Sequence, residues 1–299
     1  MQDTLKKCNL CPRNCKVNRT SSLGFCLAPQ NPKVARAALH FWEEPCISGS
    51  RGSGTVFFSG CNLKCVYCQN IEISKKAFGK EITSQRLAEI FLELQDMGAH
   101  NINLVSPTPY VPQIIEAIDL VRDRLHIPFV YNTGGYESVS TIKLLDGYID
   151  IFLTDIKYHS AELSDSYSGA KDYFTHSIAA AKKMIQQVGP PQFDQDGILK
   201  SGVIIRHLCL PGHREDSIRV LDEIKANLPE NSFILSLMSQ YTPIEGLSET
   251  HPELCRKITT FEYNKIVDHA IALGLENGYL QDRQSAKSEF TPSFDLTGI

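Results

Sequence analysis

The sequence lacks any long apolar run. No stretch approaches the roughly 20 consecutive apolar residues that a membrane helix needs, and the N-terminus, MQDTLKKCNL, is too polar for the core of a signal peptide. We therefore expect a cytoplasmic protein that does not bind a membrane. The chain also lacks an excess of basic residues, because 30 Lys and Arg stand against 34 Asp and Glu, for a formal net charge of -4. This balance argues against nucleic acid as a partner.

Cysteine, by contrast, is plentiful, with ten residues in 299. In a reducing compartment, thiols more often bind metals or take part in catalysis than form disulfides. Three cysteines stand alone, and we expect them to be small buried apolar residues: Cys46, Cys209 and Cys255. The other seven fall into two groups, Cys8/Cys11/Cys15/Cys26 and Cys61/Cys65/Cys68.

Three segments differ in composition. Residues 1–50 are rich in Cys, Pro, Asn and Gly, and we expect them to form loops tied to a metal, a cysteine-rich N-terminal extension. Residues 51–281 alternate apolar runs with helical patterns and are expected to form the core. The tail, residues 282–299, has no strong pattern, so we expect it either to cover the edge of the core or to be loosely ordered.

Six apolar runs in the core predict parallel strands buried on both faces. They are GTVFF, NINLV, IPFVYN, DIFLT, GVIIRHL and SFILSLM. Helical patterns lie between or after them, with Thr83 as a predicted cap and Thr259 with Glu262 as a predicted capping box. This order predicts an α/β fold with a parallel sheet. Periodicity alone does not choose between an open doubly wound sheet and a full or partial barrel.

Polar residues follow each predicted strand. The carboxyl ends of parallel strands share one edge, where α/β proteins bind ligands. Asp155 and Lys157 are two residues apart and so point to the same side; they suit a zwitterionic or nucleotide ligand, or form a structural ion pair. The other candidates are Ser106, Thr108, Asn132, Thr133, Arg206, His207, Gln240 and Tyr241, with the glycine pair Gly134 and Gly135.

The number of thiols distinguishes the two cysteine groups. A structural zinc site usually has four ligands and is closed, whereas three thiolates leave one metal position open for chemistry. Cys61, Cys65 and Cys68 directly follow the first core strand, in SGCNLKCVYCQN. They indicate a reactive metal site, unless Cys46 joins them as a fourth ligand of a structural or binding protein without turnover.

The C-x3-C-x2-C spacing after the first strand of a β/α barrel resembles the signature of the radical S-adenosylmethionine (SAM) enzymes, and Tyr67 fits the aromatic residue usual before the last thiol. Within that superfamily, the chain looks similar to pyruvate formate-lyase activating enzyme-like proteins from Cys8 to about Gln281. The likeness rests on HFWEEPCISGSRGSGTVFFSGCNLKCVYCQN, GAHNINLVSPTPY, LLDGYIDIFLTDIKY and LMSQYTP.

The resemblance implies a fold and a chemistry. The fold is a partial (β/α)6-type TIM barrel with a cysteine-rich N-terminal extension. Cys61, Cys65 and Cys68 would hold a [4Fe-4S] cluster that binds SAM and reduces it to methionine and a 5′-deoxyadenosyl radical. The enzyme would be an oxidoreductase that abstracts hydrogen, its substrate a glycyl residue of a partner enzyme or a small molecule. A reductant such as flavodoxin or ferredoxin would supply the electron.

The resemblance also assigns residues to cofactor binding. Asn132, Asp155 and Lys157 fall where the family places groups near the methionine carboxylate and a monovalent cation, and Arg206 matches an arginine on the fifth strand. His207 is a weaker candidate, since a packed histidine explains it equally well.

Two positions depart from the family pattern. The usual Gly-Gly-Glu motif, which binds the cofactor's amino group, is replaced by SPTPY, so this contact must come from Ser106, Thr108 or backbone carbonyls. The usual Asp of the third strand is Asn132, which removes one negative charge and puts cation binding in question.

The N-terminal cysteines are a separate problem. Cys8, Cys11, Cys15 and Cys26 supply four thiols, a closed set. They suit either a structural zinc knuckle that folds a loop-rich segment or an auxiliary iron–sulfur cluster that relays electrons.

Overall fold

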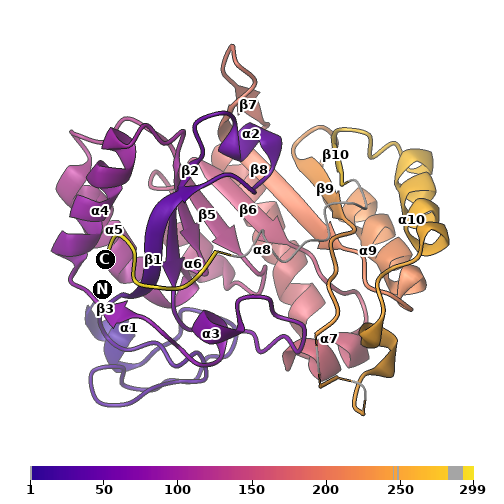
Figure 1. Cartoon of the computed structure of the whole chain (residues 1–299), viewed down its shortest axis with the longest axis horizontal. Coiled ribbons are helices and arrows are strands. Elements are labelled where there is room, and N and C mark those ends of the chain that lie inside the picture. The colour runs from indigo at the N-terminus through magenta and orange to yellow at the C-terminus, as the bar shows by residue number, and fades with distance from the viewer. Residues whose placement is uncertain (1, 245, 248, 282–291) are drawn as a thin grey trace.

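A single, mostly parallel sheet organises the chain (Figure 1). The computed structural model describes residues 2–244, 246–247, 249–281 and 292–299. Its strands are β1 (Lys33–His40), β2 (Ser53–Phe58), β3 (Lys80–Glu81), β4 (Ile102–Val105), β5 (Phe129–Thr133), β6 (Ile151–Asp155), β7 (Gln192–Phe193), β8 (Leu199–Leu208), β9 (Ile234–Met238) and β10 (Gly278–Leu280).

The six predicted strands are all present, as β2, β4, β5, β6, β8 and β9. They lie side by side in that order and are parallel, with β10 continuing the sheet next to β9. At the other end, β1 pairs with β2 and β3 pairs with β1, both antiparallel. Within the described residues the two end strands, β10 and β3, do not pair. The sheet is therefore an open, partial barrel.

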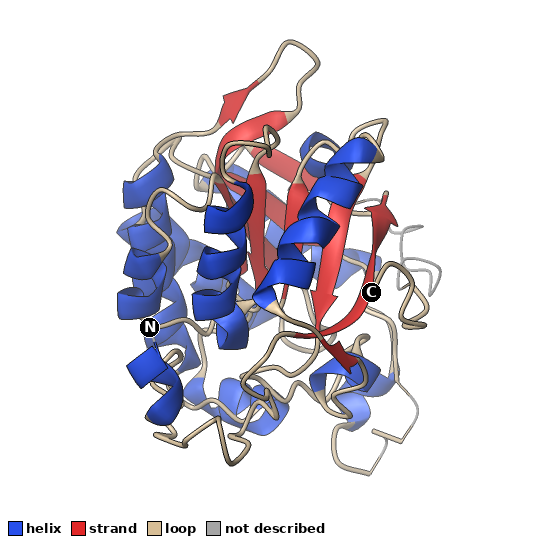
Figure 2. Ribbon diagram, turned by 90° about the vertical axis from the view of Figure 1, so that its left-hand side faces the viewer, coloured by secondary structure: helices blue, strands red, loops and turns tan. Residues whose placement is uncertain are grey.

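Helices cover the outer face of this sheet (Figure 2). Thr83 caps α4 by accepting a hydrogen bond from the Arg86 amide, and Thr259 and Glu262 form the predicted capping box of α10. The helices are α1 (Gln2–Lys6), α2 (Pro45–Ser48), α3 (Ile71–Ser74), α4 (Ser84–Asp96), η1 (Thr108–Tyr110), α5 (Val111–Val121), α6 (Val139–Leu144), α7 (Ala161–Ser168), α8 (Tyr173–Val188), α9 (Arg214–Asn227), η2 (Pro252–Cys255) and α10 (Thr260–Ala272).

Alternate strand residues face opposite sides of the sheet. On the outer side, Leu104 and Phe152 belong to the main core that the helices complete. On the inner side, Leu153 and Ile204 pack with Ile47 of the short helix α2. The strand residues two positions further along the inner face are polar, and they lead into the site described below.

The first 50 residues were expected to be loops, and for β1 this prediction is wrong. The segment KVARAALH pairs with β2, so that Ala37 lies opposite Val56. Alanine has little β-propensity, and the strand forms because Val34, Ala35 and Ala37 are buried against the core. Propensity alone therefore missed a strand that tertiary packing creates.

The described part of the tail, residues 292–299, lies along β1, as one of the two expectations had it. The Ala37 amide donates to the Thr297 carbonyl at 2.8 Å, and the Leu296 amide donates to the Ala35 carbonyl at 3.0 Å. Arg36 and Asp295 form an ion pair at 2.8 Å. Residues 282–291, the rest of the predicted tail, lie outside the described residues.

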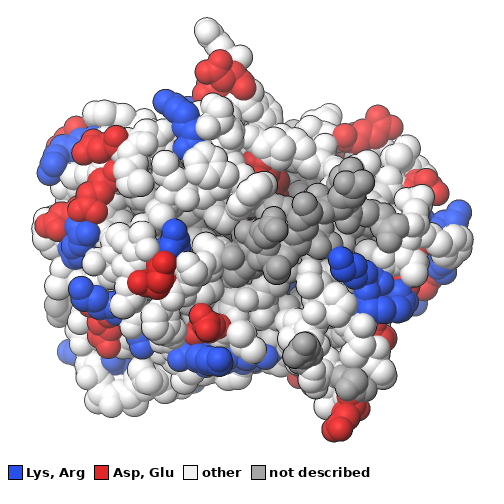
Figure 3. Space-filling view, viewed as in Figure 1, with Lys and Arg blue, Asp and Glu red and all other residues white. Residues whose placement is uncertain are grey.

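The surface agrees with the small net charge. On the face seen in Figure 3, acidic and basic side chains are interspersed. Among the residues that the structure describes, none of the helices combines the length and the apolar character needed to cross a membrane.

A close backbone approach fixes the turn after β5. Gly135 has φ +83°, and a Cβ there would overlap the carbonyl oxygen of Asp155. Gly147 has a similar φ of +75°, but a Cβ there would meet nothing within 4 Å. The two glycines therefore share the left-handed conformation and differ only in their surroundings.

We predict that Gly135→Ala lowers the free energy of unfolding by several kcal/mol, because the backbone of β6 must shift as well as accept left-handed strain. Gly147→Ala should lower the free energy of unfolding only by the strain of the left-handed conformation, about 1–2 kcal/mol. Urea unfolding of both variants measures the difference. Equal losses would show that the approach to Asp155 imposes no constraint of its own.

Candidate functional site

The carboxyl ends of the parallel strands surround a cavity of about 230 Å³. It is bounded by the loop after β2, by β5, β6 and β8, and by the segment between β1 and α2. Most of the residues expected at the site line this one cavity: Cys61, Cys65, Cys68, Ser106, Asn132, Asp155, Lys157 and Arg206.

Each of the three cavity thiols has a hydrogen-bonding partner. The Leu63 amide donates to Cys61 Sγ at 3.4 Å, and the Ser74 hydroxyl donates to Cys68 Sγ at 3.2 Å. Cys65 Sγ lies 3.0 Å from the Ser168 hydroxyl oxygen. Polar partners of this kind stabilise sulfur in its thiolate form.

Burial opposes that ionisation. It raises the pKa of Cys61 to about 12 and also raises the pKa of Cys65, where the nearby Lys157 charge opposes the shift. Without a metal these two thiols stay protonated at neutral pH, and a bound metal would supply the positive charge that keeps them deprotonated.

Arg206 is the centre of a partly buried polar network. Its Nε donates to Asp155 Oδ1 at 2.9 Å, and its other nitrogens donate to Asn132 Oδ1 at 2.6 Å and to Glu43 Oε2 at 3.3 Å. Lys157 forms an ion pair with the second oxygen of Asp155. Burial alone would raise the pKa of Asp155, but the charges of Lys157 and Arg206 hold it below its ordinary value.

Ser106 and Thr108, the two candidates in SPTPY, lie in different places. Ser106 lines the cavity and has φ 57°, a left-handed conformation that is strained for serine. Thr108 is buried, donates to Glu137 Oε1 at 2.5 Å and lines a second cavity among the N-terminal cysteines. Thr108 therefore does not line the cavity that Ser106 lines, because the 3-10 helix η1 turns it away.

His207 and the isolated cysteines also lie off the site. His207 is buried, with Nδ1 2.7 Å from the Ile156 carbonyl oxygen. Cys46 and Cys209 are buried as predicted, and Cys46 packs with Ile47 in the inner core, so it does not join the three thiols of the cavity. The expectation for Cys255 is wrong, since it is exposed at the end of η2.

Glu43 and Glu44, in the quoted stretch HFWEEPC, are site residues that we did not single out from the sequence. Glu43 Oε1 accepts hydrogen bonds from Asn103 at 3.0 Å and Asn132 at 3.1 Å. Glu44 is buried, one of its carboxylate oxygens has no hydrogen-bond partner, and burial raises its pKa. The only sequence signal is two adjacent acids inside an otherwise apolar segment.

Glu137 is a third missed acid, directly behind the glycine pair. Its carboxylate accepts hydrogen bonds from the hydroxyls of Thr108, Thr133 and Tyr131. It is completely buried, and burial raises its pKa from 4.5 to about 7. Glu137 therefore links η1, which carries Thr108, to β5, which carries Tyr131 and Thr133.

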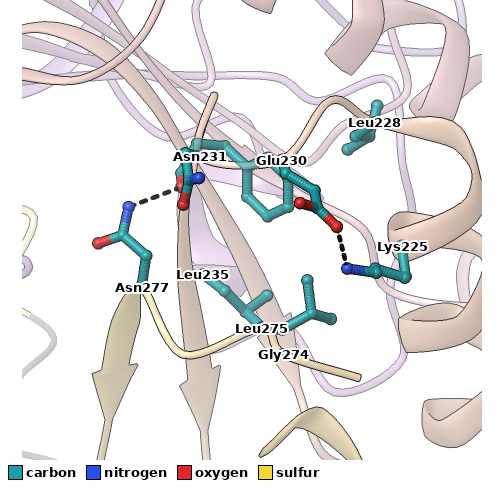
Figure 4. A pocket seen from close by; sticks show the side chains of 9 residues that line it. Lys225, Leu228, Glu230, Asn231, Leu235, Gly274, Leu275 and Asn277 are labelled. Carbon is teal, nitrogen blue, oxygen red and sulfur yellow. Dashed lines mark hydrogen bonds and ion pairs between the residues drawn. The ribbon is translucent and has the colours of Figure 1, made fainter. Parts of the chain in front are cut away.

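A further cavity, of about 280 Å³, lies at the opposite end of β9 (Figure 4). The Asn277 amide donates to the Phe233 carbonyl at 3.3 Å beside it, and Lys225 and Glu230 form an ion pair at its edge. This cavity has none of the expected site residues, and it lies at the amino ends of the strands, away from the edge where such folds place catalysis.

Comparison with known proteins decides the family. A family described as the "Radical SAM superfamily" matches residues 55–238. The chain belongs to the radical SAM superfamily. It is also 31% identical over 285 residues to the uncharacterized protein MJ0674 of Methanocaldococcus jannaschii, covering 92% of this chain and 77% of that protein.

Three solved structures share the radical SAM fold. SuiB of Streptococcus suis, bound to precursor peptide SuiA, has a TM-score of 0.50 at 17% identity, covering 74% of this chain and 46% of SuiB. The FeFe-hydrogenase maturase HydG of Carboxydothermus hydrogenoformans has a TM-score of 0.52 at 14% identity, covering 79% of this chain and 56% of HydG. Methylornithine synthase PylB has a TM-score of 0.51 at 16% identity, covering 80% of this chain and 68% of PylB. The chain spans about half the length of SuiB and HydG.

Radical SAM membership implies a [4Fe-4S] cluster and SAM, and the donor set fits both. Three thiols share one cavity with a carboxylate, an ammonium and a guanidinium, which suit the charged methionine end of SAM. Over the residues described, no three His, Cys, Asp or Glu side chains already have the arrangement that holds a metal ion.

We predict that Glu137 makes stability depend on pH. Its pKa is about 7 in the folded protein against an ordinary 4.5, so the unfolded chain loses this proton first as pH rises. The contribution is fully present below about pH 4.5 and is lost by about pH 7, a fall of about 3 kcal/mol in the free energy of unfolding. Glu137→Gln should remove that fall.

Urea unfolding at pH 5 and at pH 7.5 checks this, with Glu89→Gln, on the exposed face of α4, as the matched control. The control should keep the wild-type dependence. If Glu137→Gln keeps it too, another group is responsible.

Proposed function

We propose that this chain is a glycyl-radical-activating enzyme, an oxidoreductase that abstracts hydrogen from a glycyl residue of a partner polypeptide. The observation that supports a radical enzyme most directly is the single cavity that joins three thiols to Asp155, Lys157 and Arg206. The glycyl substrate rests on the sequence resemblance to pyruvate formate-lyase activating enzyme-like proteins.

Cys61, Cys65 and Cys68 would hold the cluster. When bound, the cluster and SAM supply an electron and a 5′-deoxyadenosyl radical, the chemistry that the side chains themselves cannot perform. A low-potential reductant such as flavodoxin or ferredoxin would deliver that electron. The polar partners of the three sulfurs, Leu63, Ser74 and Ser168, would tune the reduction potential of the cluster.

The polar network would bind the methionine end of the cofactor. Lys157 and Arg206 offer positive charge to its carboxylate, while Asp155 offers negative charge to its amino group. The Ser106 hydroxyl lines the same cavity. Because the side chains of Asp155 and Arg206 are held by each other and by Asn132, they are ordered before the cofactor arrives, which lowers the entropy cost of binding.

A neighbouring cavity of about 250 Å³ would take the substrate. It shares Cys65, Cys68 and Asp155 with the first cavity, and Leu208, Met238 and Tyr241 add apolar surface. A glycyl residue suits such a place, because with no side chain its Cα can approach a reactive centre closely.

The alternative of a zinc or iron–sulfur binding protein without turnover depended on Cys46 as a fourth ligand beside Cys61, Cys65 and Cys68. Cys46 lies instead in the inner core at the amino ends of the strands. No contact of the described residues therefore favours this alternative.

The first test is SAM cleavage. We expect the protein, reconstituted anaerobically with iron and sulfide and then reduced, to form 5′-deoxyadenosine, and Cys65→Ala to form none because the cluster loses a ligand. Chromatography of the products measures this. Cys255→Ala, at an exposed cysteine outside both groups, is the matched control and should retain full turnover. Wild-type turnover by Cys65→Ala would refute the assignment.

The second test concerns the substrate. Cells of the source species would be grown on dideuterated glycine, and their extract separated into macromolecules and small molecules. We expect 5′-deoxyadenosine to carry deuterium only when the reaction includes the macromolecular fraction, because the abstracted atom comes from a glycyl residue. Mass spectrometry measures the label. Label acquired from the small-molecule fraction alone would contradict a polypeptide substrate.

A further inference from the structure

The four N-terminal cysteines line one small cavity, although they are spread from residue 8 to residue 26 of the chain. Cys8, Cys11, Cys15 and Cys26 all line it, and its volume is about 10 Å³. That is about the space of a single water-sized probe. With the thiols placed as they are, the space admits one ion and not a cube of four irons and four sulfides.

The local backbone resembles a metal-binding knuckle. The Cys8 amide donates to the Val17 carbonyl at 3.0 Å, and the Lys16 amide donates to the Cys8 carbonyl at 2.9 Å, so the segment between them folds back as a closed turn. Tight turns hold two of the cysteines: the Asn14 amide donates to the Cys11 carbonyl at 3.0 Å, and the Leu27 amide donates to the Gly24 carbonyl at 3.0 Å, around Cys26.

Gly24 leaves room for one of these sulfurs. A Cβ at position 24 would lie 3.0 Å from Cys15 Sγ and 3.2 Å from a methyl group of Val17. The thiol of Cys15, an exposed residue, therefore lies against Gly24, two residues before Cys26.

Charge gives an independent indication. Arg19 is only 3% exposed, and its guanidinium donates to the carbonyls of Ala28, Pro29 and Pro109. Arg13 likewise donates to backbone carbonyls, and both arginines line the cysteine cavity. Over the described ranges neither arginine has a carboxylate in ion-pair contact. A buried cation without a counter-charge is costly. Four thiolates around a divalent ion carry a net charge of -2, which two guanidinium groups would balance.

We propose that Cys8, Cys11, Cys15 and Cys26 bind one structural zinc ion, which holds the N-terminal segment against the loop that carries Cys61. Zinc is redox-inert and prefers four thiolate ligands in a closed tetrahedral site. Binding releases the four thiol protons to solvent and changes no oxidation state. An iron–sulfur cluster, the other predicted occupant, would need more room than the four thiols leave between them in this arrangement.

The contacts of this segment show what the ion would stabilise. Arg13 Nε donates to the Asn62 carbonyl at 2.9 Å, within the loop of Cys61 and Cys65. Another of its nitrogens lies 3.4 Å from the Ser168 carbonyl oxygen, and the hydroxyl of Ser168 contacts Cys65 Sγ. A Cβ at Gly60 would overlap the Cys26 carbonyl, so the two cysteine segments touch at their backbones.

We expect a full-length variant with Cys61, Cys65 and Cys68 all replaced by Ala to be purified with one zinc ion per chain and no acid-labile sulfide. Metal analysis by mass spectrometry and a sulfide assay measure this. Iron with sulfide would overturn the zinc assignment in favour of a cluster, and the absence of bound metal would overturn the site. Because this variant lacks the SAM cluster, its result is independent of the proposed function.

Two further variants in that background locate the ion. Cys11→Ala with Cys26→Ala should lose the zinc, whereas Cys255→Ala should keep it. If the first variant is poorly folded, replacement of zinc by Co²⁺ in the parent protein gives a second measurement: the sulfur-to-cobalt absorption bands of a tetrahedral thiolate site are expected. A Co²⁺ spectrum without them would contradict thiolate ligation.

Hydrogen exchange separates a local role from general stability. Removal of zinc with a chelator should speed amide exchange in residues 8–19 and 60–63 and leave exchange in α9, on the far side of the sheet, unchanged. Unchanged exchange at 60–63 would show that the ion does not support the Cys61 loop.

Discussion

The largely buried charge of Arg206, whose side chain is 15% exposed, is the constraint on which the arrangement of the site depends. A guanidinium inside a barrel must be neutralised and fully hydrogen-bonded, and here Asp155, Asn132 and Glu43 do this together. These partners come from β6, β5 and the segment before α2, so one side chain fixes the relative positions of three parts of the chain. Lys157 joins the network through Asp155. This polar network therefore holds the structure together even without a ligand. A ligand that binds there must replace contacts that these groups already make with one another.

Glu43 supplies a negative charge beside Asn132, the position where the resemblance leads one to expect an aspartate. The family pattern has an aspartate on this strand, and asparagine removes its charge. In the structure the Asn132 amide donates to Glu43 Oε1, so a carboxylate stands beside the position from which the aspartate charge is missing. This carboxylate belongs to a segment that precedes the barrel. The negative charge beside Asn132 thus comes from another element, which Asn103 and Arg206 hold in place.

The difference between what could and could not be predicted follows from the same geometry. Parallel strands place their carboxyl ends at one edge, so Cys61, Asp155 and Arg206 could be brought together from the sequence without knowing the exact fold. Glu43 and Glu137 could not, because each is positioned by contacts between elements and not by its place after a strand. The direction of the Thr108 side chain could not be predicted for a related reason, since the turn of η1 decides it. The strand β1 was missed because its alanines are buried only by the finished sheet.

The two cysteine groups meet at Gly60 and Arg13, and this contact links their roles. A three-thiolate site needs an exposed metal position, which deprives its loop of one crosslink that a closed site would have. The loop of Cys61 therefore has to be held by other contacts, and the N-terminal segment supplies them through Arg13 and the Cys26 backbone. That segment is poor in apolar residues and rich in turns, so its own order requires a crosslink in place of a hydrophobic core. With the proposed zinc ion bound to the four N-terminal thiols, the closed site would order the segment, and the ordered segment would hold the loop of Cys61 without occupying its open metal position.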